Sequence, residues 1–515
     1  MSDAETTKAE RGTLWIIAVI AGAKLLLHLH TNALSGYGIF RDELYYLACA
    51  EHLSFGYVDH PPLSIWILAG WRSLMGDSIF ALRFLPALAG AGTVLLTGLL
   101  ARGLGGGRFA ILAAGTAALV SPIMLAMNSV YSMNAFDFVF WGLAALLMLR
   151  LLRGAKPGIW LWIGVILGLA LLNKIGNLWL GLGIYAGVLF SPQRKQLRTW
   201  QPWAGGLIAA LMFLPYVHWN WTHDLAHLEF IRNATAGKYS GLTRMDFLGL
   251  QFLLNNPVTV PVWLAGLWYY FASPAGRAFR PLGVLYAAAL AVLLANAHSK
   301  AEYLATAYVP LFAAGPVMLE RWLSSGRWRR LRPIMIGILM TGLALAPAVT
   351  PLLPVETYIR YAEAIGLEPG TSESKQLDRL PQFYADMFGW EQKAKDVAAT
   401  FHMLTPDEKA RCAIFGDNYG RCGAIDFFGP KYGLPKSIGR HNNYWIWGPR
   451  DYTGELMMIL GGDLKDKQEI FESVEIVGRS ACEYCMPYEN NLNIYLCRGL
   501  KTTLRESWPR LRHFE

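Results

Sequence analysis

The chain has 515 residues, of which 54% are hydrophobic and 16% are charged. An average water-soluble chain has about 25% charged residues, so this composition excludes a soluble globular protein and predicts that lipid surrounds most of the chain. The net charge of +9 does not indicate a nucleic-acid-binding protein, because 20 basic and 23 acidic residues nearly balance from Glu356 onward. The basic excess belongs to the apolar part, where it is typical of loops on one side of a bilayer.

Eleven apolar runs predict eleven membrane-spanning helices, since a span needs roughly 20 apolar residues and fewer where a helix is broken. The first run has no small-residue cleavage site after it, so we interpret it as an uncleaved helix and not as a signal peptide. The runs lie at about residues 13–31, 79–100, 108–127, 133–151, 158–173, 175–190, 202–219, 258–272, 281–297, 303–319 and 332–350.

Alternate threading of these runs places 17 of the 26 basic residues of this region on the side of the N-terminus. The positive-inside rule makes that side cytoplasmic. The loop at about 32–78 and everything after residue 354 then face outward.

Two clusters of ionisable residues stand in this outer loop, in the sequences RDELYY (residues 41–46) and GYVDHPPL (residues 56–63). Ionisable groups between long apolar runs are costly unless they serve a site. We therefore interpret the loop as the active-site loop of a membrane enzyme.

Two later segments predict irregular structure in or near the membrane. The fifth and sixth runs meet at residues 173–177 (NKIGN), and broken helices at membrane depth usually line a cavity. The loop at 218–257 mixes aromatic and charged residues, which favours short amphipathic helices along the membrane interface.

The composition becomes that of a soluble chain after residue 354, and residues 355–515 are enough for one domain. Strand-like segments at 413–415, 456–460 and 492–497 and a helix-like segment at 424–428 predict a small α/β unit. The expected organisation is a transmembrane domain over 1–354, with an outer catalytic loop at about 32–78, and a soluble α/β domain over 355–515.

Five of the six cysteines lie in this soluble domain. An outward-facing domain can hold disulfides, and we expect one, with Cys412 and Cys422 as the preferred pair. The odd number, completed by Cys497, leaves the pairing open, and Cys482-x-x-Cys485 also has the spacing of a metal or redox site. We interpret the sixth, Cys49, as a packed thiol.

The two clusters of the outer loop resemble the first outer loop of the polyprenyl-phosphate-sugar-dependent glycosyltransferases of the C-type superfamily. That group includes the protein O-mannosyltransferases and the lipid A aminoarabinose transferases, and the resemblance extends over residues 14–354. It implies a mainly α fold, a polytopic membrane helix bundle followed by an extracytoplasmic α/β domain.

The resemblance also implies an activity. The enzyme would transfer a hexose or pentose from an undecaprenyl-phosphate-type donor to a hydroxyl of a glycan, of lipid A or lipopolysaccharide, or of a protein. Transfer would occur with inversion on the outer face of the cytoplasmic (inner) membrane, and no nucleic acid is expected as a partner.

Such a transfer requires a carboxylate that takes a proton from the acceptor hydroxyl and cations that hold the departing phosphate. The resemblance implies that Asp42 is the base, that Glu43 holds the acceptor or positions the loop, and that Arg41 binds substrate. The competing interpretation is that Asp42 caps a helix that starts at Leu44.

Asp59 and His60 have two interpretations, contact with the donor phosphate or a divalent metal ion, and capping of a helix begun by the following prolines. The resemblance implies no metal requirement, so a metal site is left open. A second open question concerns the tyrosines, which either stack on sugar or prenyl groups or are ordinary interface aromatics. These are Tyr45, Tyr46 and Tyr57.

Four residues of the later spans carry further parts of the resemblance. Lys174 ends the fifth span, where it either contacts phosphate or extends to the lipid headgroups. Asp137 lies at the outer start of the fourth span and either serves the substrate or pairs with Lys174 or Arg41. Lys300 is expected to face the donor phosphate, beside Tyr303; the familiar pattern has a second tyrosine here, which this chain lacks.

Two phrases of the soluble domain, DNYG (residues 417–420) and RHNNYW (residues 440–445), resemble those of bacterial members with a soluble tail. Their rings and amides suit sugar binding, and they are equally typical of turns with buried rings. A different class of function, a transporter or lipid flippase with Asp42, Asp59 and Asp137 along its path, predicts internal symmetry, and no repeat is evident.

Overall fold

The structure is a computed structural model that describes residues 3–34, 36–371, 373 and 375–515, with side chains described from Gly12 onward. Contacts within the chain define two compact units. The helical unit contains residues 1–35, 77–218 and 241–353, and the mixed unit contains residues 36–76, 219–240 and 354–515. The mixed unit thus includes, besides the C-terminal domain expected from the sequence, most of the outer loop that we expected to belong with the membrane domain.

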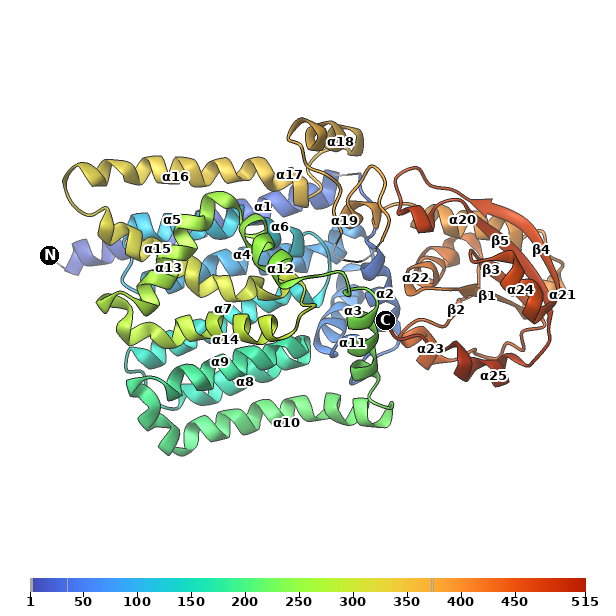
Figure 1. Cartoon of the computed structure of the whole chain (residues 1–515), viewed down its shortest axis with the longest axis horizontal. Coiled ribbons are helices and arrows are strands. Elements are labelled where there is room, and N and C mark those ends of the chain that lie inside the picture. The colour runs from blue at the N-terminus through green and yellow to red at the C-terminus, as the bar shows by residue number, and fades with distance from the viewer. Residues whose placement is uncertain (1–2, 35, 372, 374) are drawn as a thin grey trace. The chain divides into compact units, whose positions relative to one another are not determined.

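The helical unit consists of long apolar helices that run side by side (Figure 1). Its α-helices are α1 (Asp3–Leu34), α4 (Ile79–Gly103), α5 (Arg108–Val120), α6 (Pro122–Met127), α7 (Met133–Leu152), α8 (Ile159–Asn173), α9 (Leu178–Leu189), most of α10 (Trp200–Thr222), α12 (Arg244–Leu254), α13 (Val260–Phe271), α14 (Arg280–Ala295), α15 (Tyr308–Trp322), α16 (Leu331–Thr341) and α17 (Ala346–Val349). Short 3₁₀ helices join them: η1 (Ile175–Asn177), η2 (Pro192–Arg198), η3 (Pro257–Thr259), η4 (Pro274–Phe279), η5 (Ala301–Ala307), η6 (Gly326–Arg330) and η7 (Gly342–Leu345).

Each of the eleven apolar runs is helical. Within the described part of the chain, five helical segments are long and apolar enough to cross a membrane, or six if the bent pair at 175–198 is one span: Gly12–Leu34, Ile79–Gly103, Met133–Leu152, Pro274–Ala295 and Gly326–Val349. The chain is therefore a multi-pass membrane protein, while the number of eleven crossings stays a prediction.

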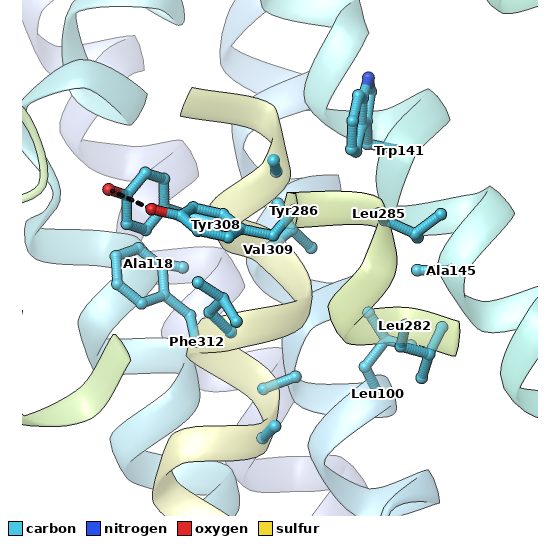
Figure 2. Packing of buried hydrophobic residues seen from close by; sticks show 14 of the residues in the cluster. Leu100, Ala118, Trp141, Ala145, Leu282, Leu285, Tyr286, Tyr308, Val309 and Phe312 are labelled. Carbon is cyan, nitrogen blue, oxygen red and sulfur yellow. Dashed lines mark hydrogen bonds between the residues drawn. The ribbon is translucent and has the colours of Figure 1, made fainter. Parts of the chain in front are cut away.

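Close packing holds the helices of this unit together. Figure 2 shows part of the core, where Tyr308 and Phe312 of α15 lie among residues of neighbouring helices and the Tyr308 and Tyr286 hydroxyls are 3.4 Å apart. Glycine permits the closest approach: a Cβ added to Gly315 of α15 would lie 1.8 Å from the Val262 carbonyl oxygen of α13. Helices in lipid lack a hydrophobic driving force toward one another, so such contacts between small residues supply much of their association.

The mixed unit is built on a five-stranded sheet in the order β2-β1-β3-β5-β4 (Figure 1). The strands are β1 (Cys412–Gly416), β2 (Ile438–Gly439), β3 (Leu456–Leu460), β4 (Phe471–Ser480) and β5 (Leu492–Leu500). β1 pairs in parallel with β2 and β3, whereas β5 pairs antiparallel with β3 and β4. The expected α/β unit is therefore present, with β1, β3 and β5 where the sequence predicted strands and with β2 and β4 in addition.

Helices cover both faces of this sheet. The α-helices of the unit are α2 (Arg41–Glu51), α3 (Leu63–Met75), α11 (Ala226–Ala236), α18 (Val355–Ala364), α19 (Gln382–Ala385), α20 (Trp390–Phe401), α21 (Pro406–Arg411), α22 (Tyr419–Phe428), α23 (Asn443–Trp447), α24 (Leu464–Ile470) and α25 (Leu504–Ser507), with 3₁₀ helices η8 (Gly429–Tyr432), η9 (Pro487–Glu489) and η10 (Trp508–Leu511). Alternate residues of β3 enter two cores, since Met458 packs with α20 and α22 while Met457 packs with Trp508 of η10. This explains why the central strands are apolar along their whole length.

The expected disulfide between Cys412 and Cys422 is wrong, because all six cysteines are free thiols. The Cys422 thiol donates to the Gly416 carbonyl, 3.3 Å away, at the end of β1. Cys412 starts the same strand, and four strand residues span about 13 Å. The two sulfurs therefore lie at opposite ends of β1.

Candidate functional site

Arg41, Asp42 and Glu43 form the first turn of α2. The helix begins at Arg41, and the Glu43 carboxylate accepts a hydrogen bond of 2.8 Å from the backbone N–H of Phe40. The residue that caps this helix is therefore Glu43, so the interpretation of Asp42 as the cap of a helix starting at Leu44 is wrong. Glu43 is fully buried, which supports its positioning role over direct contact with an acceptor.

Asp42 is held from two sides and still reaches solvent. The Tyr419 hydroxyl of α22 donates to Asp42 Oδ1 over 2.8 Å, and Arg41 Nε lies 3.3 Å from the same oxygen. The Asp42 side chain is 38% exposed. Among the residues that the structure describes, neither contact occupies Oδ2, so that oxygen remains available to accept a proton.

Arg41 connects Asp42 to residues that follow much later in the chain. Its Nη1 donates to the Tyr488 hydroxyl over 2.8 Å and lies 3.5 Å from Asp386 Oδ2, and its Nη2 lies 3.7 Å from Glu373 Oε1. Burial raises the pKa of Asp386 to about 7, although the adjacent Arg41 opposes this shift. One guanidinium thus faces three carboxylates, one of which titrates near neutral pH.

Asp59 and His60 form a second cluster under α2. The Tyr45 hydroxyl lies 2.8 Å from Asn443 Oδ1 and 3.0 Å from Asp59 Oδ1, and these two oxygens share its single proton. His60 Nε2 lies 3.7 Å from Asp59 Oδ1. Neither residue caps α3, which begins at Leu63 after Pro62. The described residues include no group of three or more His, Cys, Asp or Glu side chains that could hold a metal ion.

The three tyrosines of the loop surround His60. Tyr46 stacks on the His60 ring at 4.7 Å, Tyr57 lies 5.0 Å from it and Tyr45 meets it edge-on at 5.9 Å. All three tyrosines are buried. Their rings therefore shape the floor of the site in this structure, whereas stacking on a sugar stays a prediction.

A polar pocket of about 590 Å³ lies on the other side of Arg41 and Tyr419 within the mixed unit. Basic side chains outnumber acidic ones on its walls: the former are Arg41, Lys238, Lys375, Arg421 and Arg440, and the latter are Glu373, Asp417 and Glu515. Burial lowers the pKa of Lys238, opposed by Glu373. The pocket is large enough for a monosaccharide-sized ligand and suits a polar one.

The helical unit contains a separate cluster at the break between α8 and α9. Asn177 donates to Asp137 Oδ1 over 2.5 Å, and Lys174 Nζ lies 4.0 Å from Asp137 Oδ2. Lys174 also donates to Asn134 Oδ1 over 2.7 Å. These contacts tie the break to the start of α7, so Asp137 has the structural pairing with Lys174 that was one of its two interpretations.

Lys300 and Tyr303 belong to the same cluster. Lys174 Nζ lies 4.9 Å above the centre of the Tyr303 ring, and Lys300 Nζ lies 3.4 Å from Glu302 Oε1. The Lys174 and Lys300 side chains are each 14% exposed. The structure therefore brings together four residues that the sequence singled out in three separate segments.

Several residues of the site were missed by the sequence. Asp386, Tyr488 and Lys238 lie in segments without a motif, and only the folded chain shows that they surround Arg41. In the RHNNYW phrase, Asn443 binds Tyr45 and Tyr444 is buried. That phrase passes from a turn at Asn442 into α23, which begins at Asn443, so the interpretation as a turn with buried rings describes only its first part. Tyr419 of the DNYG phrase begins α22 and contacts Asp42.

A second missed group lies inside the first span. Lys24 is fully buried in α1 and its Nζ donates to the Met124 carbonyl over 2.9 Å, and the buried His28 follows one helical turn later. The signal was present in the sequence, since a lysine and a histidine spaced four apart within an apolar run are costly in lipid unless they are partnered.

Comparison with known proteins gives a family match for part of the chain. Residues 59–219 match the model of the family described as dolichyl-phosphate-mannose-protein mannosyltransferase. A comparison of the sequence with curated proteins found no match.

Solved structures match more of the chain. ArnT from Cupriavidus metallidurans bound to undecaprenyl phosphate is 13% identical, with 94% of this chain and 98% of that chain covered and a TM-score of 0.60. The apo state of the same protein is 14% identical to this chain, with the same coverage of both chains and a TM-score of 0.60. The Archaeoglobus fulgidus oligosaccharyltransferase in complex with zinc and sulfate is 14% identical, with 82% of this chain and 62% of that chain covered and a TM-score of 0.49.

The likeness to ArnT shows that this chain has the fold of the C-type glycosyltransferases. Together with the family match over residues 59–219, it supports the resemblance to the polyprenyl-phosphate-sugar-dependent glycosyltransferases. None of these comparisons supports a transporter or flippase.

Proposed function

We propose that this chain, which has the fold of the C-type glycosyltransferases, transfers one hexose or pentose from a polyprenyl phosphate of the undecaprenyl type to a hydroxyl acceptor, with inversion. The acceptor is a glycan, lipid A or lipopolysaccharide, or a protein. The reaction takes place on the outer face of the cytoplasmic membrane, with the N-terminus in the cytoplasm and the C-terminal α/β domain outside. The observation that carries the proposal is Asp42, a solvent-accessible carboxylate held in place by Tyr419 and Arg41.

The support for a lipid-linked donor comes from the fold and the family match. ArnT, whose fold this chain shares, was solved with undecaprenyl phosphate, and the matched family is named for a dolichyl phosphate donor. Nucleotide sugars are absent from the outer face of a cytoplasmic membrane, so a transferase there requires a donor that can be moved across in the lipid.

The proposed reaction is a single displacement. Asp42 takes the proton of the acceptor hydroxyl through Oδ2, and the hydroxyl oxygen attacks the anomeric carbon of the donor sugar. The bond between that carbon and the phosphate oxygen breaks, and the polyprenyl phosphate leaves with the electron pair. A single attack from the opposite face inverts the anomeric configuration.

Two sets of residues support these steps. Tyr419 donates to Oδ1 and fixes the direction of the carboxylate, and Arg41 Nε lies 3.3 Å from the same oxygen while Arg41 Nη1 is held by Tyr488. Lys174 and Lys300 of the helical unit are proposed to stabilise the charge that develops on the leaving phosphate. Tyr45 of α2 contacts Asp59, and His60 lies 3.7 Å from Asp59, so these two residues help to position α2.

The test is transfer by purified protein supplied with undecaprenyl-phosphate-linked hexoses and pentoses, read as release of undecaprenyl phosphate. Asp42→Asn is expected to lower the rate by about 10²–10⁴-fold, the usual contribution of general base catalysis. Tyr419→Phe keeps the ring and removes only the hydroxyl, so a smaller loss is expected. Asp451→Asn, at an exposed position of the same unit, serves as the control, and a fully active Asp42→Asn protein contradicts the proposed base.

A further inference from the structure

Cys482 and Cys485 lie on the loop that joins β4 to η9. Cys482 is half-buried, whereas Cys485 is only 5% exposed. The Cys485 thiol donates to the Cys482 carbonyl oxygen over 3.3 Å, so the two residues are in direct contact. One accessible sulfur is therefore held next to one sheltered sulfur.

The Cys482 sulfur rests against the N-terminus of α20. A Cβ added to Gly389, the residue before this 12-residue helix, would lie 2.8 Å from Cys482 Sγ. Gly389 has a φ of 84°, so glycine supplies both the backbone conformation and the space for the sulfur. The unpaired N–H groups of a helix start carry partial positive charge and favour an anion there.

A buried cation completes the surroundings of this sulfur. Lys393 lies one turn into α20 and its side chain is 1% exposed. Its Nζ would lie 3.2 Å from the same Cβ at Gly389, and it is 3.7 Å from Glu489 Oε2. A thiolate beside a helix N-terminus and an ammonium is the setting in which cysteine becomes nucleophilic at neutral pH.

The ionisation of the two thiols is accordingly unequal. The hydrogen bond from Cys485 lowers the pKa of Cys482 to about 6, with a contribution from Lys393. The same hydrogen bond and burial raise the pKa of Cys485. The three remaining soluble-domain cysteines behave differently, since burial raises the pKa of Cys412, Cys422 and Cys497.

We infer that Cys482 and Cys485 form a thiol–disulfide exchange site that reacts with a disulfide of low molecular weight, Cys482 as the attacking thiolate and Cys485 as the resolving thiol. This inference does not depend on the proposed sugar transfer. A small partner is expected because Cys482 is half-buried against α20.

The exchange has two steps. The Cys482 thiolate attacks one sulfur of the incoming disulfide, a mixed disulfide forms, and the other sulfur leaves as a thiolate. Cys485 then attacks Cys482 Sγ, the second partner thiolate leaves, and the Cys485 proton passes to it. The two cysteines lose two electrons in forming their disulfide, and the partner is reduced to two thiols.

The test incubates the whole protein with oxidised glutathione, stops exchange with acid and identifies the cysteine products by mass spectrometry. The wild type is expected to form the Cys482–Cys485 disulfide. Cys485→Ser is expected to hold glutathione on Cys482, because the resolving thiol is gone, whereas Cys482→Ser is expected to leave Cys485 unmodified. An unmodified Cys482 in the Cys485→Ser protein, or equal modification of both variants, overturns the inference.

A second measurement tests the role of the buried lysine. The rate of Cys482 alkylation by iodoacetamide near pH 6 is expected to fall about tenfold in Lys393→Met, since the rate follows the thiolate fraction. Lys395→Met removes an equal charge from an exposed position of the same helix and is expected to leave the rate unchanged. Equal rates in both variants contradict the assignment of Lys393.

Discussion

At the scale of single residues, the site is governed by the surroundings of Arg41. The guanidinium lies against Asp42, Glu373 and Asp386, and it also contacts the ring of Tyr419 and the hydroxyl of Tyr488. Burial raises the pKa of Asp386 above its ordinary range, although the adjacent Arg41 opposes this shift. The protonation of Asp386 is therefore a pH-sensitive element beside Arg41.

This predicts a pH-dependent stability. The pKa of Asp386 is 3.8 in its ordinary state and about 7 in the folded chain. Between these values the folded protein keeps a proton that the unfolded chain has lost. The stabilisation is therefore complete below pH 4 and is lost as pH rises toward 7, by at most about 4 kcal/mol.

The measurement is the midpoint of thermal unfolding in detergent between pH 4.5 and 8. The wild-type midpoint is expected to fall over this range, and Asp386→Asn, which cannot ionise, is expected to show a flatter profile. Asp451→Asn, at an exposed position, should follow the wild type. Parallel profiles for wild type and Asp386→Asn contradict the assignment.

The sequence predicted only part of this site, for a physical reason. Asp42 and Lys174 stand out because charged side chains are conspicuous among apolar runs. Asp386 and Tyr488 lie in a soluble segment, where charges and rings are ordinary, so nothing local distinguishes them. The pairing of Tyr419 with Asp42 joins residues 377 positions apart, a contact that local patterns do not encode.

At the scale of elements, the helices were the most predictable feature. Long apolar runs have to satisfy their backbone groups internally in lipid, so each run became a helix. The interruption after Asn173 was predicted from short runs and a lysine, and α8 ends there. The partner of each helix was not predictable, because apolar faces in lipid do not differ enough to specify neighbours.

The pairing of α13 with α15 is an exception, because their backbones approach closely at Gly315. Gly315→Ala places a methyl group where the Val262 carbonyl lies, so α13 and α15 have to separate, at an expected cost of about 1–3 kcal/mol. The midpoint of thermal unfolding in detergent should fall. Gly337→Ala in α16 has no atom within 4 Å of the added carbon and is the matched control. Equal midpoints for the two variants contradict a tight α13–α15 contact.

At the scale of the whole molecule, the mixed unit is assembled from three separate stretches of chain. Residues 36–76 and 219–240 join residues 354–515 in it. The first and third stretches pack closely through α2 and α22, since a Cβ added to Gly423 of α22 would lie 2.8 Å from Leu44 Cβ of α2. The α/β domain predicted from the sequence is therefore incomplete without the loop that carries Asp42.

Residues 354–515 expressed alone are accordingly expected to be unstable, because the surface of α22 that α2 covers is left exposed to water. Joining residues 36–76 to this fragment through a flexible Gly-Ser linker is expected to raise its unfolding midpoint and its resistance to protease. A linker of the same length without residues 36–76 is the control. Equal stability of all three proteins contradicts the need for α2 and α3.

Because the mixed unit combines an early and a late stretch of the chain, it can be completed only after the last stretch has been synthesised. The ribosome releases the segment with Asp42 early, and 277 further residues separate it from Pro354. Tyr419 follows Asp42 by 377 residues, so at about 5–20 residues per second roughly 20–75 seconds pass before Tyr419 is made, and Tyr488 comes later. A nascent chain thus inserts its helices while the proposed base, Asp42, still lacks the groups that orient it, and a truncated product carries this carboxylate without Tyr419.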